Sequence, residues 1–296
     1  MKAAAFAYHR PESVKEATAL LDEYGDDAKI LAGGQSLVPM LAMRLTHFEN
    51  LIDISRLDEL KSIDLCDDQV RIGAATTHAY VGMDDEVAES VPLLTLATPH
   101  IGHFQIRTRG TLGGAIAHAD PAAEYAAVAL ALDAEMDVES SAGTRQICAA
   151  EFFTGLWETS LQPGEILTAV RFPVWGPRSG FALEEFARRH GDFAIAGAAV
   201  AVDLDDERVT RCGIGLLGLG STPLRGSAAE EAVRGRSADD IDTEELGELA
   251  VAGLCDVPSD LQGSSAYRAK VGATMVSRAL TQAISRARSG AGMEAV

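Results

Sequence analysis

Cysteine is scarce in this sequence, and its spacing excludes a metal centre built from neighbouring thiolates. The four cysteines, Cys66, Cys148, Cys212 and Cys255, form no CxxC pair. Structural zinc sites and iron–sulfur clusters need thiolates grouped at short spacing. The cysteine usage therefore predicts inert thiols in a reducing cytoplasm, with no metal ligands supplied by this chain.

Positive charge and long apolar runs are also in short supply. The chain has 25 Lys and Arg residues against 44 Asp and Glu residues, for a formal net charge of −19. This acidity disfavours nucleic acid and anionic membrane surfaces as partners. No run of about 18 apolar residues occurs, which argues against a membrane-spanning helix. The first residues, MKAAAFAYHRPES, lack the apolar core of a secretory signal.

Familiar catalytic and metal-binding signatures are missing too. The sequence has no HExxH motif, no histidine-rich cluster and no GxSxG nucleophile elbow. His100 and His103 form an isolated HxxH pair, which is more typical of a polar loop than of a metal site. We therefore expect no catalytic side chain and no metal site in this chain.

The first lobe has a β–loop–α–β pattern. Ser13 and Glu16 have the spacing of a capping box, and Gly25 supplies a stop for the helix that follows Ser13. Residues 28–32 and 50–54 are typical of buried strands. Between them lie a glycine-containing loop and an apolar segment that ends near residue 45.

The rest of the chain mixes hairpins with helices, which favours the α+β class in two or three lobes. Pro92 is expected to interrupt a helical stretch that ends near Leu96. The glycine- and proline-containing segment 174–180 is the best candidate for a linker. Hairpins are predicted at 61–75, 135–147 and 193–219, a strand at 166–172, and helices at 122–132 and 266–288.

Two glycine loops, AGGQSL at 32–37 and TLGG at 111–114, are the strongest candidates for a binding site. Glycine lets backbone N–H groups approach a phosphate closely, and a following helix adds a favourable dipole. Each loop also has a hydroxyl residue, Ser36 or Thr111. Either loop alone is more often a tight turn, but two in one chain favour a shared ligand. Because no lysine follows AGGQS, a diphosphate is a better candidate than ATP.

Two other features leave alternatives open or can be set aside. The stretch 213–218 matches GxGxxG, but it lies inside an apolar, strand-like run and no amphipathic helix follows. We interpret its glycines as packing residues of a strand. Asp120 and Glu124 could be a solvated helix start, or they could accept hydrogen bonds from ligand hydroxyls. Their positions alone do not separate these two readings.

Taken together, three stretches resemble one family: AGGQSL at 32–37, HIGHFQIRTRGTLGGAIAHADPAAE at 100–124 and RRHGDFAIAG at 188–197. They are similar to the FAD-binding middle subunit of the molybdenum hydroxylases, the group of xanthine, carbon monoxide, nicotine and aldehyde dehydrogenases. The similarity continues through STPLR at 221–225 and SSAYRAKVG at 264–272, so it covers nearly the whole chain.

This resemblance implies an α+β architecture with a two-subdomain FAD-binding fold of the vanillyl-alcohol-oxidase (PCMH) type. A C-terminal α+β domain of the carbon monoxide dehydrogenase flavoprotein type would follow. The implied boundaries are 1–55 and 56–176 for the FAD-binding subdomains and 177–290 for the C-terminal domain.

The resemblance also implies which residues hold FAD. Residues 32–37 would wrap the pyrophosphate, residues 111–115 would form a second wall, and Phe193 would lie near the flavin ring. Ala115 stands where several relatives have asparagine, and Glu184 and Glu185 stand where some relatives have a lysine near the flavin. The full implied set is Ala32, Gly33, Gly34, Gln35, Ser36, Leu37, Ile101, Thr111, Gly113, Gly114, Ala115, Asp120, Glu124, Leu167 and Phe193.

The implied activity is electron transfer within a larger complex. An organic substrate would be hydroxylated at a molybdopterin centre in a large partner subunit, and electrons would pass through [2Fe–2S] clusters of a small partner to FAD in this chain. A dimer of such heterotrimers, a heterohexamer, is expected. The alternatives are a stand-alone FAD-dependent reductase of the same cofactor fold, and an interaction module whose glycine loops are only turns.

Overall fold

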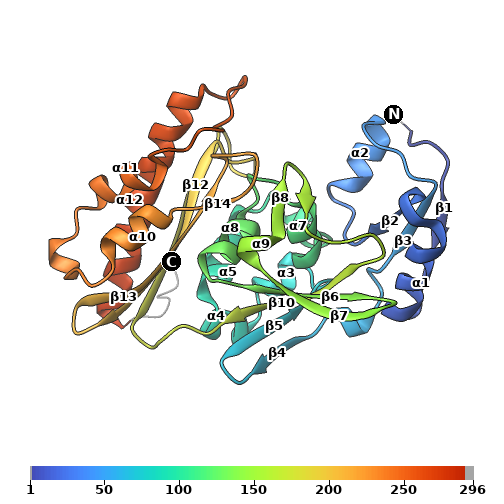
Figure 1. Cartoon of the computed structure of the whole chain (residues 1–296), viewed down its shortest axis with the longest axis horizontal. Helices are drawn as coiled ribbons and strands as arrows, with labels where there is room; N and C mark the ends of the chain where they lie inside the picture. Colours follow the sequence, from blue (N-terminus) through green and yellow to red (C-terminus); the bar gives the residue numbers. More distant parts are fainter. Residues whose placement is uncertain (1, 291–296) are drawn as a thin grey trace.

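The computed structural model describes residues 2–290 and contains three main β-sheets that follow one another along the chain. Figure 1 shows the N-terminal lobe at one end, the middle sheet with its helices in the centre, and the C-terminal sheet and helices at the other end. Helices and strands are interspersed along the described residues. The predicted α+β class is confirmed.

The N-terminal lobe is a three-stranded parallel sheet with order β1-β3-β2. The Ser13 hydroxyl accepts a hydrogen bond from the N–H of Glu16, and Gly25 ends the first helix at φ 52°. The predicted β–loop–α–β order is confirmed. The elements are β1 (Ala7–His9), α1 (Val14–Tyr24), β2 (Ala28–Leu31), α2 (Leu37–Met43) and β3 (Asn50–Asp53).

The middle lobe is a five-stranded antiparallel sheet with order β4-β5-β10-β6-β7. As predicted, the helical stretch breaks before Pro92, which takes the first position of α5, where its missing N–H costs nothing. The strands are β4 (Ile63–Cys66), β5 (Gln69–Gly73), β6 (Glu135–Ser140), β7 (Gly143–Cys148) and β10 (Ile166–Pro173). The helices are α3 (His78–Val81), α4 (Asp85–Ser90), α5 (Pro92–Ala97), α6 (Phe104–Arg107), α7 (Leu112–His118), α8 (Glu124–Ala131) and α9 (Ala149–Phe152), and a small sheet pairs β8 (Phe153–Gly155) with β9 (Glu158–Thr159).

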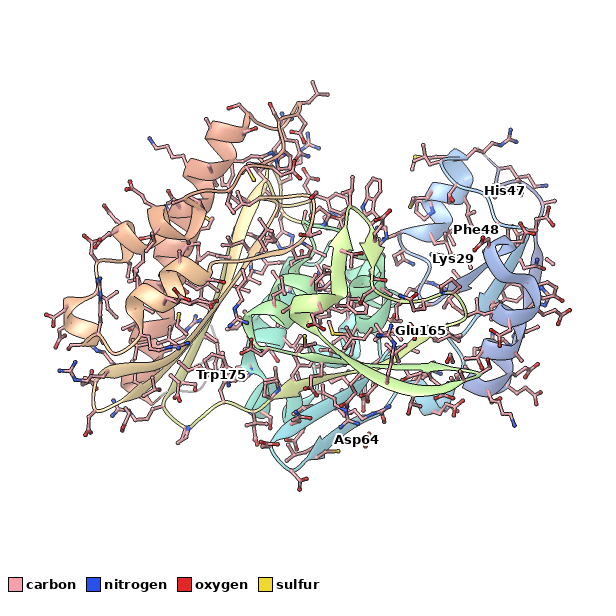
Figure 2. All side chains as sticks on the ribbon, viewed as in Figure 1. Lys29, His47, Phe48, Asp64, Glu165 and Trp175 are labelled. Carbon is pink, nitrogen blue, oxygen red and sulfur yellow. The ribbon has the colours of Figure 1, made fainter. Side chains whose placement is uncertain are left out.

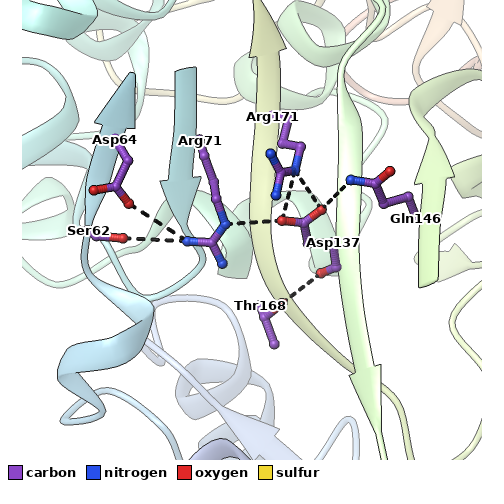
Figure 3. Close-up of polar contacts among 7 residues, drawn as sticks. All are labelled: Ser62, Asp64, Arg71, Asp137, Gln146, Thr168 and Arg171. Carbon is purple, nitrogen blue, oxygen red and sulfur yellow. Dashed lines mark hydrogen bonds and ion pairs between the residues drawn. The ribbon is translucent and has the colours of Figure 1, made fainter. Parts of the chain in front are cut away.

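One face of the middle sheet is polar, and an ion-pair network crosses its strands (Figure 3). The Asp137 carboxylate on β6 accepts hydrogen bonds from Arg171 on β10 at 2.8 Å and from Arg71 on β5 at 3.1 Å. The alternate residues of β6, Met136 and Val138, are fully buried in the largest core. The alternation of polar and apolar residues therefore fixes which face of this sheet meets the helices.

The C-terminal lobe is a four-stranded antiparallel sheet with order β11-β12-β13-β14. Three helices cover one face of it, and the opposite face packs toward the middle lobe (Figure 1). The hairpin predicted around Asp205 is confirmed. The elements are β11 (Ser179–Phe186), β12 (Ala196–Asp205), β13 (Arg208–Leu217), β14 (Leu224–Arg225), α10 (Ser227–Val233), α11 (Thr243–Val251) and α12 (Ser265–Ser289).

Helix α8 lies between the middle and C-terminal sheets and explains the GxGxxG stretch. A β-carbon on Gly213 or Gly215 of β13 would lie 1.9 Å from the carbonyl oxygen of Ala131 or Ala127 of α8. Alanine on the helix and glycine on the strand therefore let the two backbones touch. The interpretation of these glycines as packing residues is confirmed.

The predicted linker, residues 174–180, connects the middle and C-terminal lobes, and its Trp175 side chain is packed against the C-terminal sheet. Trp175, labelled in Figure 2, is 8% exposed, and its ring meets that of Phe181 at 6.1 Å between centroids. The guanidinium of Arg211 lies over the Trp175 ring at 4.0 Å. These contacts tie the C-terminal sheet to the end of β10.

Candidate functional site

The first glycine loop, residues 32–36, joins β2 to α2 and leaves its amide groups free. Gly34 adopts φ 72°, a backbone conformation that favours glycine. In the part of the chain that the structure describes, the four consecutive N–H groups of residues 33–36 donate to no protein acceptor. The Ser36 hydroxyl caps nothing. This row of donors at a helix start can bind an anionic group.

The second glycine loop lies directly against the first. A β-carbon on Gly33 would fall 2.1 Å from the carbonyl oxygen of Arg109 and 2.7 Å from the Cα of Gly110. A β-carbon on Gly114 would face the Cβ of Ala32 at 3.5 Å. The structure therefore brings together two loops that are about eighty residues apart in sequence, and the absence of a β-carbon at Gly33 is needed for the close approach.

The second loop uses most of its amide groups internally, which corrects the expectation that both loops present a row of free amides. Thr111 caps α7, and its hydroxyl oxygen accepts from the N–H of Gly114 at 3.0 Å. The N–H groups of Leu112 and Gly113 donate to the carbonyls of Thr76 and Ala74. A capping threonine and a neighbouring β-turn use these donors internally. The second loop can therefore form one wall of a binding site, and the Thr111 hydroxyl can donate its proton to a ligand.

A buried histidine, His78, holds the second loop in place. Its Nε2 lies 2.8 Å from the carbonyl oxygen of Thr111, and its backbone N–H donates to the carbonyl of Gly110 at 2.9 Å. Burial lowers the pKa of His78 to about 4, so the imidazole is neutral. No sequence motif singles out His78; the available signal was the polar Thr76-Thr77-His78 run before an expected helix.

A cavity of about 450 Å³ opens beside the two loops. Thr76 is one of its lining residues, and the Thr76 hydroxyl is buried and has no hydrogen-bond partner within the described residues. Two cations, Lys61 and Arg109, also line the cavity, which the sequence reasoning missed because neither follows a glycine loop closely. The lining residues are Ala32, Gly33, Ser55, Lys61, Ala75, Thr76, Thr77, Tyr80, Thr108, Arg109 and Thr111.

The two acidic candidates, Asp120 and Glu124, lie at the start of α8. An Asp120 carboxylate oxygen accepts from the N–H of Ala122 at 2.8 Å, so this side chain shapes the turn before the helix. Burial raises the pKa of Glu124 to about 8, and the nearby Glu185 carboxylate adds to the effect. Both side chains are half-buried at the start of α8, and their role toward a ligand stays a prediction.

The three apolar candidates have different surroundings. Ile101 is 9% exposed and Leu167 is 4% exposed, and both belong to the largest core. Phe193 is 69% exposed in the loop between β11 and β12. This loop contacts the loop after Ile101, because a β-carbon on Gly191 would fall 2.5 Å from the ring of His103. Ile101 and Phe193 thus lie on two loops that touch.

These observations fit a dinucleotide with a diphosphate centre. The unpaired N–H groups of residues 33–36 and the missing β-carbon of Gly33 would let the backbone bind a diphosphate closely. The buried Thr76 hydroxyl has no protein partner, so it could hydrogen-bond to a polar group of the ligand. In contrast, no group of three or more His, Cys, Asp or Glu side chains within residues 2–290 could hold a metal ion. Among the helices of this range, none has both the length and the apolar character to span a bilayer.

Comparison with known proteins defines the class and then the family. Two protein-family sequence models match this chain. The model of the FAD binding domain in molybdopterin dehydrogenase matches residues 4–175, and the model of the CO dehydrogenase flavoprotein C-terminal domain matches residues 181–283. The 6-hydroxypseudooxynicotine dehydrogenase complex subunit alpha of Paenarthrobacter nicotinovorans is 43% identical over 97% of both chains. Caffeine dehydrogenase subunit beta of Pseudomonas sp. strain CBB1 is 39% identical, again over 97% of both.

Solved structures agree with these relatives. A chain of the reconstituted CO dehydrogenase from Oligotropha carboxidovorans superposes with a TM-score of 0.94 at 35% identity, covering 97% of this chain and all of the other. The fold and site define an FAD-binding flavoprotein component of an oxidoreductase. The chain belongs to the family of FAD-binding medium subunits of the molybdenum hydroxylases.

Proposed function

We propose that this chain carries electrons from the [2Fe–2S] clusters of a small partner subunit, through FAD, to an external acceptor. The organic substrate would react at a molybdopterin centre in a large partner subunit, and two heterotrimers would form a heterohexamer. The subunit designations of the relatives support assembly with partners. In this proposal the iron–sulfur centres would belong to the small partner chain.

The observation that carries this proposal is the row of unpaired N–H groups at residues 33–36. These donors and the Ser36 hydroxyl would bind the FAD pyrophosphate, and the Thr76 and Thr111 hydroxyls would donate from the facing wall. Lys61 and Arg109 would balance part of the phosphate charge from the cavity. Bound FAD supplies the chemistry of accepting electrons and releasing them to a further acceptor.

The remaining cofactor residues act farther along the groove. Asp120 and Glu124 would bind hydroxyl groups of the ribityl or adenosine portions, and Ile101, Leu167 and Phe193 would exclude water from the ring system. Because Phe193 is exposed while Ile101 is buried, we expect FAD to cover mainly Phe193 on binding. The domain boundaries 1–55, 56–176 and 177–290 and the cytoplasmic location belong to the same proposal; four free cysteines support a reducing compartment.

The direct test is to purify the chain and titrate it with FAD. We expect a yellow protein that binds one FAD per chain and co-purifies from its host with an iron–sulfur subunit and a molybdopterin subunit. A chain that takes up no FAD would refute the cofactor site. An FAD-loaded chain without partners that reduces an organic substrate with NADPH would instead support the stand-alone reductase.

A further inference from the structure

A cluster of three titratable side chains bridges the middle and C-terminal lobes close to the proposed flavin site. The Nδ1 of His100, which precedes Ile101, lies 3.2 Å from a carboxylate oxygen of Glu185 on β11. The side chain of Glu185 is 7% exposed, and its second carboxylate oxygen is buried with no partner among the described residues. Glu124 on α8 completes the cluster, since it interacts electrostatically with both.

The position of the cluster follows from two touching loops. His100 lies at the base of the loop that carries Ile101, and Glu185 lies at the base of the loop that carries Phe193. The N–H of Ile195 donates to the carbonyl of Phe186 at 2.8 Å and closes the second loop. These loops meet at Gly102 and Gly191, and the His100–Glu185 pair lies at the bases of the same two loops, which carry the residues proposed to contact the flavin.

The charges around His100 are almost all negative. Glu124 approaches His100 from the start of α8, and Glu184 and Glu185 approach it from β11; Asp120 in turn acts on Glu124. The cation of the neighbouring loop, Arg107, is directed to the carbonyls of Pro99, Ile101 and Gly102 instead. Hydrogen bonding to Glu185 raises the pKa of His100, and the surrounding carboxylates strengthen that effect against burial.

From this geometry we infer that the His100–Glu185–Glu124 cluster takes up a proton from solvent when FAD bound to this chain is reduced. Two electrons from the partner's iron–sulfur clusters, together with the proton that the flavin ring binds, leave one net negative charge on the ring. A second proton taken up by the cluster cancels that charge. The inference rests on the proposed function, because it requires bound FAD.

The physical reason is electrostatic linkage. A new negative charge near His100 and Glu124 favours the protonated form of both groups and raises both pKa values. Glu124 has a pKa of about 8 without that charge, so the uptake should be largest from about pH 8 upward. Below about pH 6 the cluster already holds its protons, and reduction should draw in few more.

The test is the pH dependence of the midpoint potential of bound FAD between pH 6 and 9, because its slope reports the protons taken up per electron. We expect a steeper slope above pH 7.5 for the wild-type chain than for His100→Gln or Glu185→Gln. His100→Lys is the decisive variant: lysine keeps the ion pair but titrates near pH 10.4, so it should keep the fold and flatten the slope. His9→Gln, which changes a histidine bonded to Asn50 in the N-terminal lobe, is the matched control.

Two outcomes would overturn the inference, and both are distinct from a failure of the proposed function. Equal slopes for wild type, His100→Gln, His100→Lys and Glu124→Gln, all loaded with FAD, would show that the cluster takes up no proton. If His100→Gln loses FAD, an NMR titration of His100 in wild type decides the matter: an unchanged His100 pKa between the oxidised and reduced holoprotein contradicts the inference. A wild-type chain that binds no FAD would refute the proposed function itself.

Discussion

The carbonyl oxygen of Arg109 lies only 2.1 Å from the position that a β-carbon on Gly33 would take, which is too close for both atoms to be present. The backbone of the first loop therefore rests on the backbone of the second, and the unpaired N–H row at 33–36 is fixed by this contact. Gly33 is required by steric contact and not by its φ, since it lies outside the left-handed region. This distinction can be tested by substitution.

Gly33→Ala should lower FAD affinity by about tenfold or more, a loss of about 1.4 kcal/mol or more, because the loop must move away from Arg109. Isothermal titration or flavin fluorescence measures this loss. Gly235→Ala is the control: Gly235 has φ 76° and open space around it, so that variant should lose some stability and keep its FAD affinity. Equal FAD affinity for Gly33→Ala and wild type would contradict the loop assignment.

Thr76→Val should weaken FAD binding without destabilising the chain that lacks FAD. The Thr76 hydroxyl is buried and unpartnered, so replacing it with a methyl group removes an unsatisfied polar atom from the unliganded chain. If the hydroxyl donates to FAD, affinity should fall by about 0.5–1.5 kcal/mol, or about two- to tenfold. Thermal unfolding and FAD titration report the two effects separately.

Thr98→Val provides the reverse pattern. The Thr98 hydroxyl is buried and hydrogen-bonded to the carbonyl of Leu94 and to the hydroxyl of Tyr125. Its removal should cost about 1 kcal/mol of stability and leave FAD affinity unchanged. A Thr76→Val variant that behaves like Thr98→Val would mean that the Thr76 hydroxyl has a structural role and does not face the cofactor.

Local patterns in the sequence were sufficient to predict many of the elements of the fold, although β1, α7 and the small β8–β9 sheet were not predicted. The Ser13–Glu16 capping box, Pro92 at a helix start and the hairpin around Asp205 each depend on residues a few positions apart. The overall class and the family followed from the glycine loops and the flanking motifs. The cofactor role of each named residue remains a prediction.

What could not be predicted depends on contacts between distant residues. The pairing of Leu112 N–H with Thr76 and the burial of His78 arise only when β5 and α7 meet, so the second loop gave no local sign that its amides are used. Lys61 and Arg109 reach the cavity from separate loops. The His100–Glu185 pair joins two lobes and is 85 residues apart in sequence, which no periodicity reveals.

His78 should make the chain less stable in mild acid. Its pKa is about 4 in the folded chain and about 6.5 when unfolded, so the unfolded state binds the proton more tightly. The contribution of neutral His78 is complete above about pH 6.5 and is lost as pH falls toward 4, by about 3 kcal/mol. Urea unfolding at pH 7.5, 5.5 and 4.5 measures the change.

His78→Gln is the comparison that isolates this histidine. Glutamine can still donate to the carbonyl of Thr111 but does not titrate, so the variant should lose less stability between pH 6.5 and 4 than wild type does. Its stability at pH 7.5 should be lower, because glutamine fills the buried space less well. Parallel pH profiles for the two proteins would show that other groups cause the acid sensitivity.

Gly215→Ala should destabilise the chain without weakening FAD binding by the folded protein. The new β-carbon would lie 1.9 Å from the carbonyl oxygen of Ala127, which forces β13 and α8 apart. Such overpacking should cost about 2 kcal/mol or more. Because the glycine loops lie on other elements, FAD affinity measured well below the unfolding temperature should stay within about twofold of wild type. Loss of FAD affinity with unchanged stability would instead mean that GxGxxG at 213–218 binds the cofactor, contrary to its packing role.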